Sequence, residues 1–246
     1  MRSHVNRADV FLVEHGYAKS RAEAQEAIEA GKVFSDGRRV IKPSQSLNES
    51  CHIKYERPHP YVSRGAVKLA SALNHFKLEP YGLVCLDIGA STGGFTEVLL
   101  LRGAEKVYAI DVGHGQLDPK IAKDPRVISL EKVNARALTR SLIPQKPKAI
   151  VVDVSFISLK LALPPALAMA EKGAWLVALV KPQFEAGKEN VGKGGIVKDE
   201  AAQGAALKEI ERWLIEDCGW SVLGTMNSPI AGGDGNREFL IAAVKQ

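Results

Sequence analysis

Residues 85–95 combine glycines with an acidic side chain at the end of an apolar strand. Glycine at such a point lets the backbone approach a ligand closely and lets the N-terminus of the next helix face it. The spacing of Asp87, Gly89 and Gly93 is neither GxGxxG nor a phosphate-binding loop ending in Gly-Lys-Ser/Thr. Asp111 closes the next strand, where a carboxylate in a doubly wound sheet accepts hydrogen bonds from a ribose diol. The segment predicts a nucleoside-bearing cofactor, with a structural glycine turn or a nicotinamide site as the alternatives.

Four charged residues that are distant in the sequence could meet at one cleft. Asp153 ends the fourth apolar strand and Lys181 ends the fifth, so both are expected at the carboxyl edge of the sheet. A charge in that position is unfavourable if it is buried without a partner. Glu238 begins the last strand, and Lys68 lies on the helix before the first. Taken singly, Lys68, Lys181 and Glu238 could be solvated charges, and Asp153 could be a turn residue.

Alternating strand and helix patterns from Arg64 onward would position these residues. They predict a mostly parallel, doubly wound α/β sheet with helices between the strands. The predicted helices are 65–76, 96–102 and 200–217. The predicted strands before the final pair are 83–88, 107–110, 127–130, 150–152 and 176–180. Two further strands, 220–227 and 238–244, flank the loop 231–236, which is rich in glycine. Such a loop predicts that the final pair is antiparallel.

The first 57 residues predict a separate small α+β domain. Helical patterns over 7–15 and 21–30 are joined by a short turn, with Ser20 as N-cap and Glu23 completing a capping box. Short strands follow at 32–35, 38–41 and 52–55, the first two turned by Asp36-Gly37. Pro58-His59-Pro60 then forms a stiff connector. We predict domains at 1–57 and 64–246, with a linker at 58–63.

Composition limits the class of protein. Hydrophobic residues make up 46% and charged residues 25% of the 246, an ordinary balance for a globular chain. The longest apolar runs are far shorter than the roughly 20 residues that span a bilayer, and residues 1–7 open no secretory segment. Three separated cysteines without a CxxC pair indicate neither disulfides nor a metal site. We predict a cytoplasmic protein, whose net charge of +5 suits a polyanionic partner.

Several ordered motifs resemble those of known methyltransferases. The glycine run with Asp111 is similar to motifs I and II of S-adenosylmethionine-dependent methyltransferases, and Lys68, Asp153, Lys181 and Glu238 resemble the Lys-Asp-Lys-Glu tetrad of FtsJ-like ribose 2′-O-methyltransferases. Longer runs resemble the TlyA (haemolysin A) family of rRNA 2′-O-methyltransferases over essentially the whole chain: Val62 to Leu69, Asp87 to Leu99, Asp111 to Leu117, Asp153 to Leu159 and Val180 to Glu185. Residues 1–57 resemble that family's S-four-type RNA-binding domain.

The resemblance implies S-adenosylmethionine-dependent 2′-O-methylation of a cytidine in ribosomal RNA. The implied partner is ribosomal RNA or a ribosomal subunit, with no DNA and no membrane. Long members of the family modify both subunits and short members only the large one. Because this chain ends at Gln246, soon after its last strand, we favour the large subunit. Some members hold a Trp in the linker where Tyr61 stands here.

The tetrad is predicted to handle the proton of the ribose hydroxyl. That hydroxyl is a poor acid near neutrality, so the transfer needs a base. We hypothesise that Lys181 is the base when it is neutral, that Lys68 favours that state and holds the target oxygen, and that Asp153 and Glu238 orient the two ammonium groups. Six residues are predicted to bind the cofactor: Asp87, Gly89, Ser91, Gly93, Asp111 and Asn134. Asn134 would meet the adenine edge or merely cap a loop.

RNA binding is assigned to basic and polar residues at or beside turns of the first domain, where backbone amides can join them on phosphates: Arg7, Lys19, Ser20, Arg21, Lys32 and Lys42. Ten Lys and Arg against eight Asp and Glu leave residues 1–57 a net charge of only +2. Salt bridges to Glu14, Glu23, Glu26 and Glu29 could absorb much of that charge.

Three rival functions remain at this stage. The chain could be a non-catalytic RNA-binding factor in ribosome assembly, which an intact tetrad disfavours. It could be a membrane-lytic protein, for which no strongly amphipathic basic helix with exposed aromatic residues is evident. An NAD-linked enzyme is disfavoured by the glycine spacing.

Overall fold

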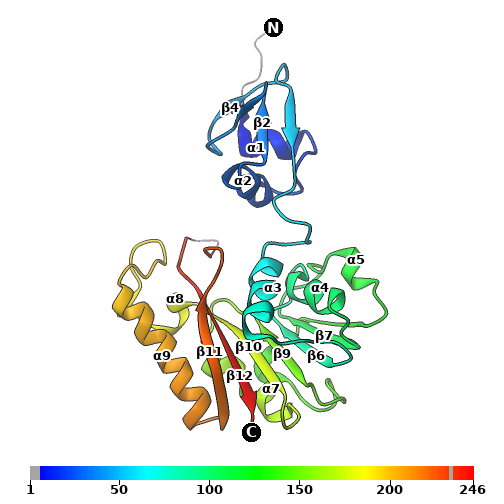
Figure 1. The fold of residues 1–246 in the computed structure, drawn as a ribbon, viewed down its shortest axis with the longest axis vertical. Helices are drawn as coiled ribbons and strands as arrows, with labels where there is room; N and C mark the ends of the chain where they lie inside the picture. The colour runs from blue at the N-terminus through cyan, green and yellow to red at the C-terminus, as the bar shows by residue number, and fades with distance from the viewer. Residues whose placement is uncertain (1–5, 233–234) are drawn as a thin grey trace. The chain divides into compact units, whose positions relative to one another are not determined.

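The structure is a computed structural model that describes residues 6–232 and 235–246. The opening residues 1–5, and Gly233 and Asp234 of the predicted loop, lie outside the described part. Contacts divide the chain into two compact units, one that ends at Pro60 and one that begins at Tyr61. Figure 1 shows the helices and strands of both units.

The N-terminal unit packs two helices on short strands. Its elements are β1 (Asn6–Arg7), α1 (Ala8–Glu14), α2 (Arg21–Glu29), β2 (Val33–Ser35), β3 (Arg38–Arg39), β4 (Ser46–Leu47) and β5 (Ile53–Tyr55). Strand β2 pairs antiparallel with β3 and β5, and β1 pairs antiparallel with β4. The predicted helices and three strands are present with small changes at their ends, whereas the two-residue strands β1 and β4 were not predicted.

Local chemistry explains the predicted features of this unit. Oγ of Ser20 accepts a hydrogen bond from the backbone N–H of Glu23 at 3.2 Å, so Ser20 is the N-cap of α2. Asp36 and Gly37 both have positive φ, which suits the tight turn between β2 and β3. The small core contains Phe11 and Leu12 of α1 together with buried residues of α2 and β2.

The C-terminal unit is built on one sheet of seven strands. Its elements are α3 (Gly65–Phe76), β6 (Val84–Ile88), α4 (Gly94–Leu101), β7 (Lys106–Asp111), α5 (Pro119–Ala122), β8 (Val127–Glu131), η1 (Ala135–Ala137), β9 (Ala149–Val152), α6 (Leu159–Ala162), α7 (Pro164–Met169), β10 (Trp175–Val180), α8 (Pro182–Glu185), η2 (Lys188–Asn190), α9 (Glu200–Glu216), β11 (Trp220–Asn227) and β12 (Phe239–Lys245). The strand order is β11-β12-β10-β9-β6-β7-β8.

The direction of the strands confirms the predicted fold class. Strands β8, β7, β6, β9 and β10 are parallel to one another, whereas β12 is antiparallel to both β10 and β11. The last strand therefore inserts between β10 and β11, as the orange and red arrows of Figure 1 show. The chain order reverses between β6 and β9, which is where ligands bind in open α/β sheets.

One predicted helix is missing. We expected a helix in every connection of the sheet, but the segment between β8 and β9 holds only the short 3₁₀ turn η1. Pro144 and Pro147 lie in that segment. Each lacks a backbone N–H and disfavours helical backbone in the residue before it, which accounts for the difference.

Both faces of the sheet are buried, which explains the continuous apolar strands. In β9, Ile150 and Val152 belong to one core, while Ala149 and Val151 belong to the other. Residues of α3 and α4 complete one core, and residues of α6, α7 and α9 complete the other. Within the described ranges, every helix is too short or too polar to cross a membrane.

Candidate active site

The structure brings the four predicted tetrad residues to one cleft as two ion pairs. Lys68 of α3 donates a hydrogen bond from Nζ to Oε2 of Glu238, the residue before β12, at 2.5 Å. Both side chains are buried, with 6% and 3% of their surface exposed. A buried ammonium is tolerated here because a carboxylate compensates it.

The second pair lies where β9 and β10 end. Nζ of Lys181 is 2.6 Å from Oδ1 of Asp153, and the two side chains are 10% and 22% exposed. Among the described residues, that carboxylate oxygen receives no well-directed hydrogen bond, so charge holds the pair together. The directed hydrogen bond of Lys181 goes instead to Oγ of Ser155, at 2.9 Å. All four tetrad residues line a cleft of about 240 Å³.

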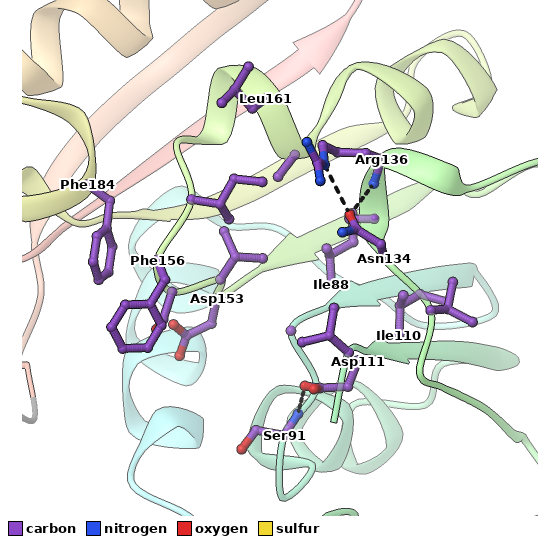
Figure 2. A pocket seen from close by; sticks show the side chains of 18 of the residues that line it. Ile88, Ser91, Ile110, Asp111, Asn134, Arg136, Asp153, Phe156, Leu161 and Phe184 are labelled. Carbon is purple, nitrogen blue, oxygen red and sulfur yellow. Dashed lines mark hydrogen bonds between the residues drawn. The ribbon is translucent and has the colours of Figure 1, made fainter. Parts of the chain in front are cut away.

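A larger cavity of about 920 Å³ adjoins this cleft (Figure 2). Four of the predicted cofactor residues line it: Gly89, Ser91, Asp111 and Asn134. The cavity and the cleft share Gly89, Ser91 and Asp153, so a ligand in the cavity would have one end beside the tetrad. The volume lies within the usual range of small-molecule sites, roughly 300–1,000 Å³.

Asp111 holds the loop that borders the cavity. Its two carboxylate oxygens accept hydrogen bonds from the backbone N–H groups of Ser91 and Gly113, each at 2.7 Å, and Figure 2 shows the first. An ionised carboxylate offers about four acceptor positions, so Asp111 can still accept from ribose hydroxyls. Ser91 has left-handed backbone, with φ of 47°, a conformation that is uncommon outside glycine and often found at binding sites.

Asn134 both caps a turn and faces the cavity. Its Oδ1 accepts hydrogen bonds from the backbone N–H of Arg136 at 3.0 Å and from Nε of the same residue at 3.4 Å (Figure 2). Because Oδ1 is engaged in this way, the side chain would offer its amide N–H groups to a ligand. The two roles considered for Asn134 are therefore compatible.

Two predicted cofactor residues, Asp87 and Gly93, do not line the cavity. Asp87 is fully buried, and its Oδ2 accepts a hydrogen bond from Oγ1 of Thr96 at 2.6 Å. Burial raises the pKa of Asp87 to about 7; the hydrogen bond from Thr96 opposes the increase, and the charge of Asp153 adds to it. A side chain on Gly93 would begin 2.8 Å from Leu117. In the structure Asp87 binds the first turn of α4 through Thr96, and Gly93 leaves room for Leu117.

Gly89 is required by packing as well as by backbone conformation. Its φ is +85°, and an added Cβ would lie 2.3 Å from the carbonyl oxygen of Asp153. The turn after β6 therefore rests directly on the end of β9. The absence of a side chain at Gly89 lets Asp153 lie close to the cofactor cavity.

Comparison with known proteins places the chain in a family. The FtsJ-like methyltransferase family matches residues 61–245, and the S4 domain matches residues 7–50. The chain is 44% identical to the 16S/23S rRNA (cytidine-2′-O)-methyltransferase TlyA of Mycobacterium tuberculosis, over 96% of this chain and 88% of that protein. The chain belongs to the TlyA family of FtsJ-like methyltransferases.

Other members of the TlyA family show the same extent of similarity. The 23S rRNA (cytidine-2′-O)-methyltransferase TlyA of Campylobacter jejuni is 37% identical over 96% of this chain and 98% of its own. Hemolysin A of Brachyspira hyodysenteriae is 40% identical over 95% of this chain and 98% of its own. A solved structure from Streptococcus thermophilus, described as a hemolysin, is 41% identical, has a TM-score of 0.78, and covers 98% of this chain and 89% of its own.

The S4 domain carries the predicted RNA-binding residues on its surface. Arg7 and Arg21 are about half exposed, and both guanidinium groups contact the buried carboxylate of Asp9. Burial would raise the pKa of Asp9, but hydrogen bonds from these arginines and from Gln25 outweigh burial and hold it below its ordinary range. Asp9 is a residue that the sequence reasoning missed, and it fixes the positions of two predicted RNA contacts.

The remaining RNA-binding candidates differ in their exposure and in their partners. Lys19, Ser20 and Lys42 are exposed, and Lys32 is partly buried and pairs with Glu56 at 3.3 Å. Of the helix glutamates that could absorb the charge of residues 1–57, Glu23 pairs with Arg57 at 3.1 Å. Arg7 and Arg21, in contrast, pair with Asp9 of α1.

Three residues beside the tetrad of this TlyA-family chain were not predicted to act. Ser155 contacts Lys181, and Phe156 is 91% exposed and has left-handed backbone with φ of 64°. Arg64 lines the tetrad cleft. Ser155 and Phe156 lie inside the motif after β9, but only the structure shows the positive φ and the contact with Lys181.

Proposed function

We propose that this chain transfers a methyl group from S-adenosylmethionine to the 2′-hydroxyl of a cytidine in ribosomal RNA. The observation that carries the proposal is the arrangement of the two ion pairs, Lys68 with Glu238 and Lys181 with Asp153, in a cleft that shares a wall with a nucleoside-sized cavity. Because the cavity and the cleft adjoin, a cofactor in the cavity would contact a hydroxyl in the cleft, as an in-line transfer requires.

The residues of the cavity fit this cofactor. Asp111 would accept from the ribose hydroxyls, and the amide N–H groups of Asn134 would meet the edge of the adenine. S-adenosylmethionine supplies an activated methyl group on a sulfonium centre. Asp87 and Gly93 would act indirectly, because Asp87 binds Thr96 of α4 and Gly93 leaves room for Leu117.

The tetrad would accept the proton of the target hydroxyl and hold its oxygen. Lys181, when neutral, would accept that proton, while Lys68 would hold the oxygen. Asp153 and Glu238 would keep the two nitrogen atoms at their positions, since each contacts one of them directly. General base action of this kind is typically worth about two to four orders of magnitude in rate.

Recognition of RNA would use both parts of the chain. The S4 domain would contact phosphates through Arg7 and Arg21, whose guanidinium groups Asp9 anchors. Arg64 lines the tetrad cleft and could bind a phosphate of the target strand. Phe156 presents an exposed ring at the wall of the cavity (Figure 2), and an unpaired base can stack on such a ring.

We propose the large-subunit RNA as the principal substrate. The names of the relatives from M. tuberculosis and C. jejuni both include 23S rRNA, whereas only the first includes 16S rRNA. No feature of the described structure favours membrane lysis or a purely structural role in ribosome assembly over methyl transfer.

Purified protein, tritiated S-adenosylmethionine and isolated large and small subunits test the proposal. We expect label in 23S rRNA, recovered as 2′-O-methylcytidine after nuclease digestion and mass spectrometry. Label on a base, or no label in either subunit or in naked rRNA, would refute it. Label in 16S rRNA alone would refute the preferred substrate but not the reaction.

A further inference from the structure

Ser155 is the directed hydrogen-bond partner of Lys181. Nζ of Lys181 donates to Oγ of Ser155 at 2.9 Å, whereas Oδ1 of Asp153, although 2.6 Å away, receives no well-directed hydrogen bond among the described residues. Ser155 is exposed and lines the cofactor cavity. It lies two residues after Asp153, so the segment that follows β9 supplies both the charge and the hydrogen bond.

The geometry of an amine gives this hydrogen bond a specific consequence. Once the Cε–Nζ bond is in place, the nitrogen can only rotate about it, and its three remaining positions turn together. A charge contact alone leaves that rotation loose, but one directed hydrogen bond fixes it. The lone pair of a neutral amine then lies at one of the two remaining positions, whose directions are fixed. Lys181 lines the tetrad cleft, where the hydroxyl of the target would enter.

Lys68 has a different setting. Its Nζ donates a directed hydrogen bond to Oε2 of Glu238, in a buried pair. A carboxylate partner that is both charged and well directed holds that nitrogen at one position and in one orientation. Lys181 combines a poorly directed contact with a carboxylate and a directed hydrogen bond to a hydroxyl, so Ser155 sets the orientation of its nitrogen.

We infer that Ser155 is a positioning residue, which orients the amine of Lys181 so that its lone pair faces the hydroxyl of the target. This inference rests on the proposed function. In the transfer, the O–H bond of the target breaks and a new N–H bond forms on Lys181. The oxygen forms its bond to the methyl carbon as the bond from that carbon to the cofactor sulfur breaks, and the proton on Lys181 is then lost to water.

Three variants of the full chain test the role of Ser155. Ser155→Ala removes the acceptor, Ser155→Thr restores a hydroxyl, and Ser141→Ala is a matched control because Ser141 is exposed and lines neither the cavity nor the cleft. For Ser155→Ala we expect kcat to fall about tenfold or more, a part of the usual contribution of a general base. The KM for RNA, the Kd for S-adenosylmethionine and the Tm should stay close to those of the wild type. Ser155→Thr should recover most of kcat.

A second measurement needs neither RNA nor cofactor. Lysine-selective nitrogen NMR reports how fast the ammonium protons of Lys181 exchange with water, and this exchange should quicken in Ser155→Ala and slow again in Ser155→Thr. Unchanged exchange, an unchanged kcat, or a parallel loss of cofactor affinity in Ser155→Ala would each overturn the inference. A wild-type chain that transfers no methyl group would instead overturn the proposed function, while the NMR comparison would still decide whether Ser155 orients Lys181.

Discussion

Replacing Asp87 by Asn should change how the stability of the C-terminal unit depends on pH. Burial raises the pKa of Asp87 from 3.8 to about 7, so the folded protein retains a proton that the unfolded chain has already lost. A folded-state pKa that is raised in this way contributes stability that is fully present below pH 3.8 and is lost as pH rises through 7. The wild type should therefore lose stability over this window, whereas Asp87→Asn cannot titrate there.

The magnitude follows from the shift. About three pKa units correspond to about 4 kcal/mol, at about 1.4 kcal/mol for each pH unit between the two values. An Asn amide also buries an N–H group that needs an acceptor, but that penalty is independent of pH and shifts the whole curve. Only the change in the stability difference with pH is therefore diagnostic.

Tryptophan fluorescence during urea unfolding measures the relevant unit in the full chain. All three tryptophans, Trp175, Trp213 and Trp220, belong to the C-terminal unit. The stability of wild type minus that of Asp87→Asn should fall by about 2 kcal/mol between roughly pH 4.8 and 6.3. The same difference measured for Asp217→Asn gives the effect of net charge and is subtracted. A corrected difference that stays flat from pH 4.5 to 7.5 would refute the reasoning.

Three further predictions concern packing, cofactor binding and RNA binding. In urea unfolding, Gly89→Ala should destabilise the C-terminal unit by about 1–3 kcal/mol more than Gly219→Ala. Both glycines have positive φ, but only at Gly89 would the added Cβ clash with backbone atoms. Equal losses of stability in the two variants would contradict this. Asp111→Asn should weaken the binding of S-adenosylmethionine, measured by calorimetry, about 10- to 100-fold, because hydrogen bonds to charged groups contribute about 1.5–3 kcal/mol. Asp124→Asn, which alters the pair with Arg126, should bind S-adenosylmethionine as the wild type does. Arg21→Ala should reduce the slope of log affinity for RNA against log salt by about 0.7–0.9, and an unchanged slope would remove Arg21 from the interface.

The sequence predicted the fold well where hydrophobic periodicity and turn residues alone determine an element. Strand 220–227 and helix 65–76 have the bounds that we expected, and the antiparallel direction of the last strand is confirmed. The strands are buried on both faces, so their apolar runs were unambiguous. The connection after β8 was predicted wrongly because two prolines outweighed the general rule of alternating helix and strand.

Contacts between distant side chains were harder to predict. The convergence of the tetrad was expected from strand ends, but its division into two pairs depends on the insertion of β12 beside β10, which places Glu238 near Lys68. Nothing in the sequence assigned a role to Ser155 or Asp9, whose partners are known only from the structure. Gly93 was expected to approach a ligand, whereas the structure shows that its missing side chain makes room for Leu117. Such packing reasons leave no periodic signal in the sequence.

The most direct test of the account is to separate methyl transfer from cofactor binding at Lys181. Lys181→Ala removes the amine, and Lys181→Arg keeps a positive charge beside Asp153 but cannot accept a proton. We predict that both variants lose transfer of tritiated methyl groups to ribosomal RNA, while calorimetry still shows binding of S-adenosylmethionine close to that of the wild type. Transfer that persists in either variant, or cofactor binding that disappears together with transfer, would contradict the assignment of Lys181 as the base.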